Sequence, residues 1–312
     1  MASSPARREP LFILCPGRSF SSVVCAVIGQ HPQCYGLPEL NLFLGDTLGE
    51  AMQVYTKSAV GGTGFAGLRR TVAQIHAGVQ TEASVAEAEA WIAANRHLTP
   101  RQFLDHVLDC IGPDRILVEK SPTNVIQPAF LARLVAAYPE ANYLQLLRHP
   151  RSRGKSQMAA RVQKREGKKI RQFMARVTGE KVGDYEGKWT DTHLMLHGLG
   201  RALPTGQMMR LHGENLLRDL RLYLPQVCEW LGIRSDAEAI AAMLRPEESP
   251  YSSIGPANAQ YGANRGFLAK PELDMERLAQ MEEATLEAPM EWAPDRHFGA
   301  DTRRLAAYYG YR

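Results

Sequence analysis

The sequence predicts an α/β protein with a largely parallel central sheet that is covered by helices on both faces. Four short apolar runs read as strands, and a turn and a helix-like stretch follow each of them. The runs are 11–14, 115–119, 142–147 and 207–211, and the helix-like stretches are 22–28, 126–137, 152–166 and 215–231. Short strands that alternate with longer helices are typical of parallel sheets. Such sheets bind ligands at the carboxyl ends of their strands, so the chemistry is expected there.

The composition is that of an ordinary globular chain. Its 312 residues, 45% hydrophobic and 22% charged, suffice for one large domain or two small ones, and we expect a single domain over 1–312. A net charge of +4 is too small to indicate a nucleic-acid partner but suits an anionic ligand. Five cysteines without a Cys-x-x-Cys pair argue against a disulfide framework or a zinc site. Lacking both an apolar stretch of about 18 residues and a secretory signal, the sequence predicts a cytoplasmic protein without a membrane span.

Three segments lie outside the strand–helix pattern. Residues 42–112 form a long helical insertion between the first two predicted strands, with helices expected at 84–95 and 100–110, and we interpret it as a lid or substrate wall. Residues 161–188 carry nine Lys or Arg against four Asp or Glu, as an anion-facing surface or a solvated helix face would. Residues 244–272, rich in Pro, Gly, Ser and Asn, are expected to form an irregular loop.

The stretch 10–41 contains a predicted strand, a turn rich in hydrogen-bond donors and a helix start, and it is the most informative part of the sequence. A buried strand at 11–14 ends at Pro16 and Gly17, and a helix opens near Ser22. Between them one guanidinium and three hydroxyls crowd against a helix N-terminus, which already carries unpaired N–H groups and a partial positive charge. The residues are Arg18, Ser19, Ser21 and Ser22. This pattern favours a phosphate socket, although an ordinary capped turn would also fit it.

Two more predicted strand ends present cations. Arg148 closes the run 142–147, and Ser156 follows about two helical turns later, so both could reach one phosphate. Arg148, Arg151, Arg153 and Lys155 crowd a helix start where acids are preferred, which suggests that an anion is missing from the sequence. Lys120 follows the run 115–119, and a lysine there is costly to bury unless it faces a cleft. Cations at three strand ends indicate a ligand with several phosphate-like groups.

The order of these motifs resembles the sulfotransferases that use 3′-phosphoadenosine 5′-phosphosulfate (PAPS). Residues 15–22, Cys-Pro-Gly-Arg-Ser-Phe-Ser-Ser, resemble the family's 5′-phosphosulfate loop, usually Pro-Arg-Ser-Gly-Thr-Thr. Residues 148–156 resemble its 3′-phosphate motif, and 209–216 its Val-Arg-Tyr-Glu-Asp-Leu segment. Residues 262–268 fall where the family has a C-terminal loop over the cofactor, here expected at about 250–270. The resemblance covers about residues 10–270 and implies a sheet similar to that of the P-loop kinases.

The resemblance also implies roles for individual residues. Donor-binding residues would be Arg18, Ser19, Phe20, Ser21, Ser22, Arg148, Ser156, Asn264, Arg265 and Gly266. Lys120 and Arg18 would stabilise the transferred sulfuryl group. The donor would be PAPS and the product 3′,5′-adenosine bisphosphate (PAP), with no metal and no nucleic acid partner. The acceptor would be a hydroxyl of a small molecule or biopolymer (sugar, lipid, peptide or natural product). The protein could form a homodimer.

The sequence departs from the family pattern at the loop and at the base. Phe20 stands where the family has glycine and cannot adopt a positive φ cheaply, so the loop must differ in shape or bear strain. The cytosolic branch has its histidine base two residues after the lysine, where this chain has Pro122. The tyrosylprotein branch uses a glutamate in a segment that resembles residues 31–39, so Glu39 is the candidate base. A histidine base, or Glu39 as a helix cap, is the alternative.

Other readings of the sequence are weaker. Gly62–Gly67 fits G-x-G-x-x-G, but no buried strand precedes it. Gly154-Lys155-Ser156 lacks the earlier glycine of a nucleotide-triphosphatase loop. His193 and His197 have metal-ligand spacing without a third ligand, and core or substrate-facing positions suit them better. The rival functions are a nucleotide-dependent kinase of related fold and a degenerate, non-catalytic nucleotide-binding protein.

Overall fold

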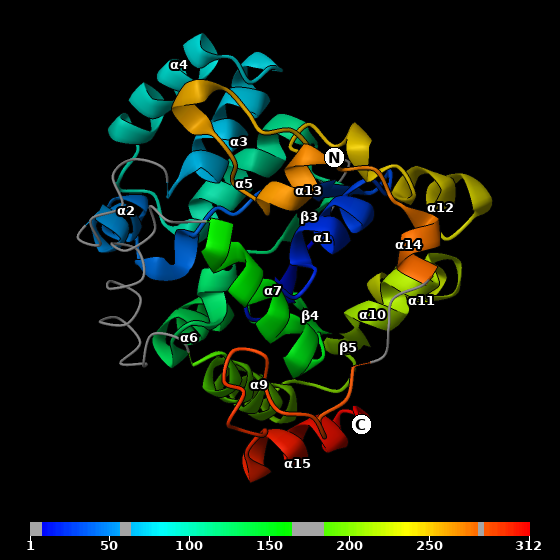
Figure 1. Ribbon diagram of the computed structural model, residues 1–312. Helices are drawn as coiled ribbons and strands as arrows, with labels where there is room; N and C mark the ends of the chain where they lie inside the picture. Colours follow the sequence, from blue (N-terminus) through cyan, green and yellow to red (C-terminus); the bar gives the residue numbers. More distant parts are fainter. Residues whose placement is uncertain (1–7, 57–63, 164–183, 280–283) are drawn as a thin grey trace.

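Strand β1 lies at the centre of a five-stranded sheet, all of whose strands run parallel. The computed structural model describes residues 8–56, 64–163, 184–279 and 284–312. The strands are β1 (Leu11–Leu14), β2 (Cys34–Gly36), β3 (Ile116–Glu119), β4 (Asn142–Leu147) and β5 (Met208–His212), in the order β2-β3-β1-β4-β5 (Figure 1). In the register, Leu11 lies opposite Val118 of β3 and Asn142 of β4. All five carboxyl ends therefore meet at one edge of the sheet.

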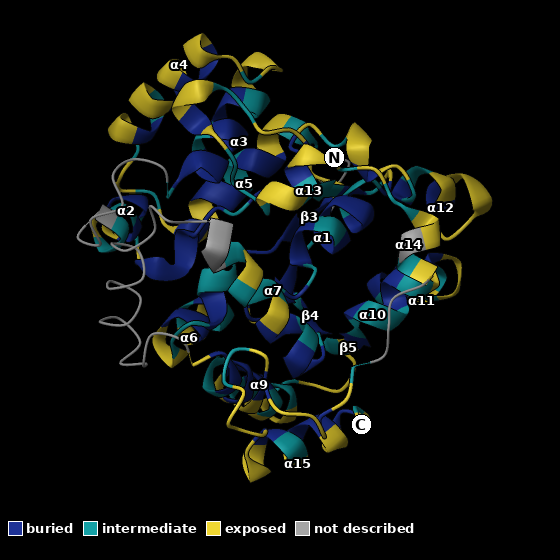
Figure 2. Ribbon diagram, viewed as in Figure 1, coloured by how far each residue is buried: buried dark blue, intermediate teal, exposed yellow. Residues whose placement is uncertain are grey.

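The four residues of β1 alternate between two hydrophobic clusters, because successive side chains of a strand point to opposite faces. Leu11 and Ile13 pack on one face with α1 (Ser21–Gly29), α10 (Gly213–Arg218), α11 (Leu220–Leu231) and α12 (Ala237–Met243). Phe12 and Leu14 pack on the other face. Figure 2 shows the central strands buried under helices whose outer sides are exposed, whereas the edge strands β2 and β5 are only partly buried. Burial on both faces explains why the strands read as continuous apolar runs.

The predicted insertion contributes to the second face. Its helices α2 (Leu48–Thr56), α3 (Ala66–Ala77), α4 (Glu82–Ala94) and α5 (Pro100–Ile111) share one core cluster with α6 (Pro128–Ala137). Capping boxes start two of them, at Thr81 with Ser84 and at Thr99 with Gln102. The insertion is thus part of the main hydrophobic core, and its role as a lid or substrate wall stays a prediction.

A third cluster closes the β4–β5 side. Trp189 of α9 (Tyr185–Ala202) and Leu305 of α15 (Ala300–Tyr308) pack with Leu147 of β4. The remaining helices of the described residues are α7 (Pro150–Gln163), α13 (Arg265–Ala269), α14 (Met275–Ala279) and the 3-10 turns η1 (Leu42–Leu44), η2 (Pro122–Val125), η3 (Pro246–Glu248) and η4 (Ala257–Ala259). None of the described helices has both the length and the apolar character needed to cross a membrane.

The predicted α/β class with a parallel sheet is confirmed, and the four expected strands lie within one residue of their predicted bounds. Strand β2 was not predicted. The helix expected at 126–137 begins only at Pro128, because Gln127 before it is extended, as the residue before proline prefers. The helix expected at 215–231 is two helices: Asp219 leaves the helical conformation, and its side chain caps α11 at Leu222. Most of the basic stretch 161–188 lies outside the described residues.

Candidate functional site

The loop between β1 and α1 leaves the start of α1 prepared for an anion. Phe20 occupies the N-cap position, where its side chain makes no capping hydrogen bond, and the first turn contains no acidic residue. Ser19 is fully buried, and its Oγ has no hydrogen-bond partner among the described residues. A buried hydroxyl without a partner is costly. Together with the N–H groups of the helix start, it forms a cradle that suits phosphate oxygens.

Phe20 adopts the positive φ that the sequence analysis identified as a source of strain. Its φ is 65°, and Arg18 two residues earlier has a φ of 73°. A left-handed conformation costs a residue with a Cβ about 1–2 kcal/mol. The guanidinium carbon of Arg148 lies 4.1 Å from the centre of the Phe20 ring. A Cβ at Gly213 would lie 2.6 Å from the ring, so the ring fills the space that this glycine leaves.

Arg18 joins the first loop to the motif after β4. Its Nε donates to Ser156 Oγ at 3.1 Å, and its carbonyl oxygen accepts from Arg148 Nη1 at 2.7 Å. Arg148 and Ser156, which were predicted to reach one phosphate, are therefore connected by hydrogen bonds to Arg18. The contact lies between β1 and β4, where the connections of the sheet diverge in opposite directions and where open α/β sheets bind their ligands.

Both arginines keep their charge at neutral pH. Burial lowers the pKa of Arg148 to about 10, while the nearby Glu214 raises it and Arg18 lowers it. Burial also lowers the pKa of Arg18, and Glu39 opposes that shift. The Nε of Arg148 is buried without a hydrogen-bond partner within the described chain. Two desolvated cations with an unused donor form a strongly attractive site for an anion.

The other cations at the start of α7 make contacts within the protein. Arg151 is buried and donates to the carbonyl oxygens of Thr285, Ala288 and Pro289. Arg153 donates to Gly17 O at 3.1 Å and to Tyr185 O at 2.9 Å, and Lys155 pairs with Glu291 at 2.9 Å. Of the four cations in this stretch, these three thus make contacts within the protein, and the anion that the sequence suggests stays a prediction for Arg148.

Lys120 links the first loop to Glu39. Its side chain is 2% exposed, and its Nζ donates to Glu39 Oε1 at 2.9 Å and to Ser22 Oγ at 3.1 Å. The Glu39 side chain is 32% exposed, so solvent still reaches the carboxylate. Glu39 caps no helix: the next helical turn starts at Leu42 with Asn41 in the N-cap position. The site therefore joins a lysine, a carboxylate and the first turn of α1 in one hydrogen-bonded group.

The Glu39 backbone is held by two close glycine contacts. Its N–H donates to Gly262 O at 2.7 Å, and a Cβ at Gly67 would lie 2.2 Å from its carbonyl oxygen. Gly67 is the last glycine of the rejected G-x-G-x-x-G pattern, so its function is close approach and not dinucleotide binding. Tyr55, in α2 of the insertion, also lies near Glu39: burial raises the pKa of its phenol, and the Glu39 charge adds to that shift.

The predicted C-terminal loop reaches the same group. The backbone N–H of Asn264 donates to Ser22 Oγ at 3.0 Å, and its side chain caps α13 through the N–H of Gly266. The Arg265 guanidinium lies 4.0 Å from the centre of the Tyr261 ring. Arg70, which the sequence analysis did not identify, is fully buried and donates to the carbonyl oxygens of Ser253 and Tyr261. It anchors the loop, and a buried arginine in a helix carries no local sequence signal for such a role.

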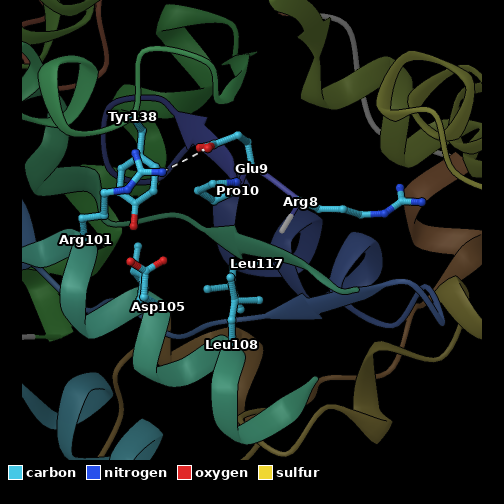
Figure 3. Close-up of a pocket in the computed structure, with 9 residues that line it drawn as sticks. Arg8, Glu9, Pro10, Arg101, Asp105, Leu108, Leu117 and Tyr138 are labelled. Carbon is cyan, nitrogen blue, oxygen red and sulfur yellow. Dashed lines mark hydrogen bonds and ion pairs between the residues drawn. The ribbon is translucent and has the colours of Figure 1, made fainter. Parts of the chain in front are cut away.

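A small cavity lies at the opposite, amino-terminal end of the strands (Figure 3). It has about 30 Å³, room for a water or two. Arg101 crosses its mouth, where it pairs with Glu9 and lies over the Tyr138 ring. It is far from the strand ends that carry the cations, and we assign it no role.

Comparison with known proteins decides the family. A model described as the Sulfotransferase family matches residues 10–237, well over half of the chain. The chain belongs to the sulfotransferase family. Its fold is that of the sulfotransferase domain from the curacin biosynthetic pathway (TM-score 0.75, 21% identity, 98% of each chain covered). It is also that of the sulfotransferase domain from the Synechococcus PCC 7002 olefin synthase (TM-score 0.71, 23% identity, 100% of this chain and 99% of that chain). Curated proteins gave no significant match.

The match includes three of the four motifs in the site of this sulfotransferase. The loop after β1, Lys120 with Glu39, and Arg148 with Ser156 lie inside the matched range, and Asn264 lies beyond it. Polar residues that the sequence analysis did not single out hold the loop after β3. The buried Glu119 accepts from Ser121 N–H at 2.9 Å and from Asn124 Nδ2 at 2.8 Å, and burial raises its pKa. This network fixes the backbone from which Lys120 projects.

Proposed function

We propose that this sulfotransferase moves the sulfuryl group of PAPS to an acceptor hydroxyl in one in-line displacement. The observation that carries the proposal is the position of Lys120, which contacts both the loop expected to hold the 5′-phosphosulfate and the carboxylate expected to act as base. A cation between the donor and the base can stabilise charge on the transferring oxygens while the hydroxyl loses its proton.

The donor would occupy the cradle between β1 and β4. The N-terminus of α1 with Ser19, Phe20, Ser21 and Ser22 would hold the 5′-phosphosulfate, and Arg148 with Ser156 the 3′-phosphate. The buried Ser19 Oγ and Arg148 Nε, which lack partners in the described chain, support this fit because bound phosphate oxygens would satisfy both. Asn264, Arg265 and Gly266 would cover the donor from the C-terminal loop, which already contacts Ser22.

The reaction would be a single displacement at sulfur, in which the acceptor oxygen replaces the bridging phosphate oxygen. The acceptor oxygen forms a bond to sulfur as the bond from sulfur to the bridging phosphate oxygen breaks, and Glu39 takes the hydroxyl proton. Lys120 and Arg18 stabilise the negative charge on the transferred group and on the leaving PAP. Arginine, lysine and a helix N-terminus supply the positive charge, so the proposed step uses no metal.

The acceptor would approach from the Glu39 side, near Tyr55 and the helical insertion. The two solved structures compared above are sulfotransferase domains whose names place them in biosynthetic systems. A hydroxylated biosynthetic intermediate is therefore the first acceptor class to test, followed by sugars, lipids and peptide tyrosines.

A screen with sulfur-labelled PAPS tests the proposal. Each acceptor class is incubated with the wild-type protein and with Glu39→Gln, and the label that reaches the acceptor is measured. We expect transfer to one class by the wild type and at least about 100-fold less by the variant, the usual contribution of a general base. Transfer that is equal in both proteins would remove Glu39 as the base and leave the donor assignment standing.

A further inference from the structure

Two histidines and a cysteine meet on the outer surface of the helical insertion. His76 lies in the last turn of α3, and His106 and Cys110 lie four residues apart on α5, on one face of that helix. His76 and Cys110 are exposed and His106 is half-buried. Trp91 of α4 stacks on the His106 ring, with the ring centres 4.8 Å apart, and meets the His76 ring edge-on at 5.2 Å. The indole thus holds both imidazoles in place.

The three potential ligand atoms converge on one point. His76 Nε2 lies 2.8 Å from His106 Nε2, and Cys110 Sγ lies 3.9 Å from the same atom. All three lie within 4.8 Å of one another. Tetrahedral Zn²⁺, with bonds of about 2.0–2.1 Å to nitrogen and about 2.3 Å to sulfur, would require ligand atoms roughly 3.3–3.6 Å apart. Side-chain rotations that move these ligand atoms by about 1 Å would produce that geometry.

We propose that His76, His106 and Cys110 bind a zinc ion. Two imidazoles and one thiolate form a borderline-soft set that favours Zn²⁺ over Mg²⁺ or Ca²⁺. On binding, the Cys110 thiol gives its proton to solvent and its sulfur bonds to the metal, while water fills the fourth position. The proposal goes against the sequence prediction that the chain has no zinc site. That prediction rested on the missing Cys-x-x-Cys pair, whereas here one ligand lies 30 residues before the next.

The metal would brace the insertion and take no part in group transfer. It would join the carboxyl-terminal ends of α3 and α5, two helices that otherwise meet through core side chains such as Val72 and Phe103. Gly67, which contacts the Glu39 backbone, lies at the other end of α3, about 14 Å away at 1.5 Å per residue. Because α3 positions Glu39 through Gly67, stiffening this helix would support the site from a distance.

Cobalt titration of the full-length protein, without a histidine tag and after removal of metals by chelation, tests the site. Co²⁺ substitutes for Zn²⁺ and reports a thiolate ligand by a charge-transfer band in the near ultraviolet. We expect the band to saturate at one ion per chain and to disappear in Cys110→Ser. His106→Ala should weaken binding at least 10-fold, and His97→Ala, which changes an exposed histidine outside the cluster, should leave it unchanged. Absence of the band in the wild type, or its persistence in Cys110→Ser, would overturn the proposal.

Alkylation of the native wild-type protein provides a test that does not depend on variants. Cys110 is exposed, whereas Cys15, Cys25, Cys34 and Cys228 are buried, so iodoacetamide should label Cys110 first. We expect Zn²⁺ to slow that labelling at least 10-fold and to raise the melting temperature, since a ligand that binds only the folded state stabilises it. Unchanged labelling at saturating Zn²⁺ would contradict a zinc–thiolate bond. Neither readout depends on donor or acceptor.

Discussion

Lys120 and Glu39 form an ion pair in which the lysine is buried and the carboxylate is still reached by solvent. The pair joins two segments that are 81 residues apart, and Ser22 in the first turn of α1 accepts from the same ammonium group. Neither partner is free to turn away without leaving the lysine charge buried and unpaired, which is costly. The pair therefore holds a proton acceptor beside the anion cradle before any ligand binds.

Replacing Glu39 with Gln should slow turnover strongly while donor binding persists. The amide oxygen can still accept from Lys120, which keeps the local geometry at some cost in stability because the buried ammonium loses its counter-charge, but the amide cannot take a proton. We expect kcat to fall at least about 100-fold and the Kd for PAP to change less than about 3-fold. Glu87→Gln, on the exposed face of α4, is the matched control and should behave as wild type. A large loss of PAP binding in Glu39→Gln would assign the residue a structural role instead.

Replacing Lys120 with Met should lower kcat strongly and change the free energy of unfolding only slightly. Methionine fills a similar buried volume without the charge, and Glu39 is exposed enough to be solvated once it loses its partner. We expect kcat to fall about 100- to 1,000-fold, as for the loss of one transition-state donor. The free energy of unfolding, measured in urea, should change by less than about 2 kcal/mol. Near-normal turnover in a folded Lys120→Met protein would be incompatible with the assigned role.

Phe20 offers a direct measurement of backbone strain in the site. Phe20→Ala and Phe20→Gly both lose the ring that lies under Arg148, but only glycine adopts the φ of 65° without a steric penalty. We expect the glycine variant to be more stable than the alanine variant by about 1 kcal/mol in urea unfolding. Equal stability of the two variants would show that the loop carries no strain at this position.

Buried histidines should make the protein sensitive to acid. Burial lowers the pKa of His193 to about 3 and that of His149 to about 4, whereas an unfolded histidine titrates near 6.5. Below about pH 6.5 the unfolded chain binds protons that the folded chain does not. The free energy of unfolding therefore decreases as the pH is lowered, until the pKa of the folded state is reached.

Each such histidine contributes up to about 1.4 kcal/mol per pH unit in that range. His193→Asn can keep an acceptor for Gln145. It should reduce the slope of the unfolding free energy against pH, between about pH 6 and about pH 4, by the amount that corresponds to about one bound proton. The comparison uses urea unfolding at several pH values. The same slope in both proteins would mean that His193 is protonated in the folded state.

Local patterns in the sequence predict the strands and the strand-end cations, but not their partners. The runs that contain β1 and β4 are recognisable because both faces of each strand are buried, and the turns after them carry Arg18 and Arg148. Strand β2 is not recognisable, since three residues at the sheet edge are too few for a pattern. Glu39 became a candidate base only through the family resemblance. Its contact with Lys120 depends on how β3 lies beside the start of the insertion.

Side-chain roles that depend on distant partners were beyond sequence reasoning. Arg151 and Arg153 have the same local signature as Arg148, yet they donate to backbone carbonyls as far as 138 residues away, and Arg151 also pairs with Glu291. Arg70 likewise acts on carbonyl groups more than 180 residues later in the chain. A cation pattern shows that charge must be compensated, and only the tertiary structure shows whether a ligand or the protein compensates it.

The most direct test of the donor assignment is calorimetric titration of the wild-type protein with PAP and, separately, with ATP. The cradle around Ser19 and Arg148 predicts that PAP binds at least about 10-fold more tightly than ATP, a difference of about 1.4 kcal/mol. Arg148→Lys, which loses the planar guanidinium over Phe20, should remove most of that preference. Binding of ATP without binding of PAP would contradict the account.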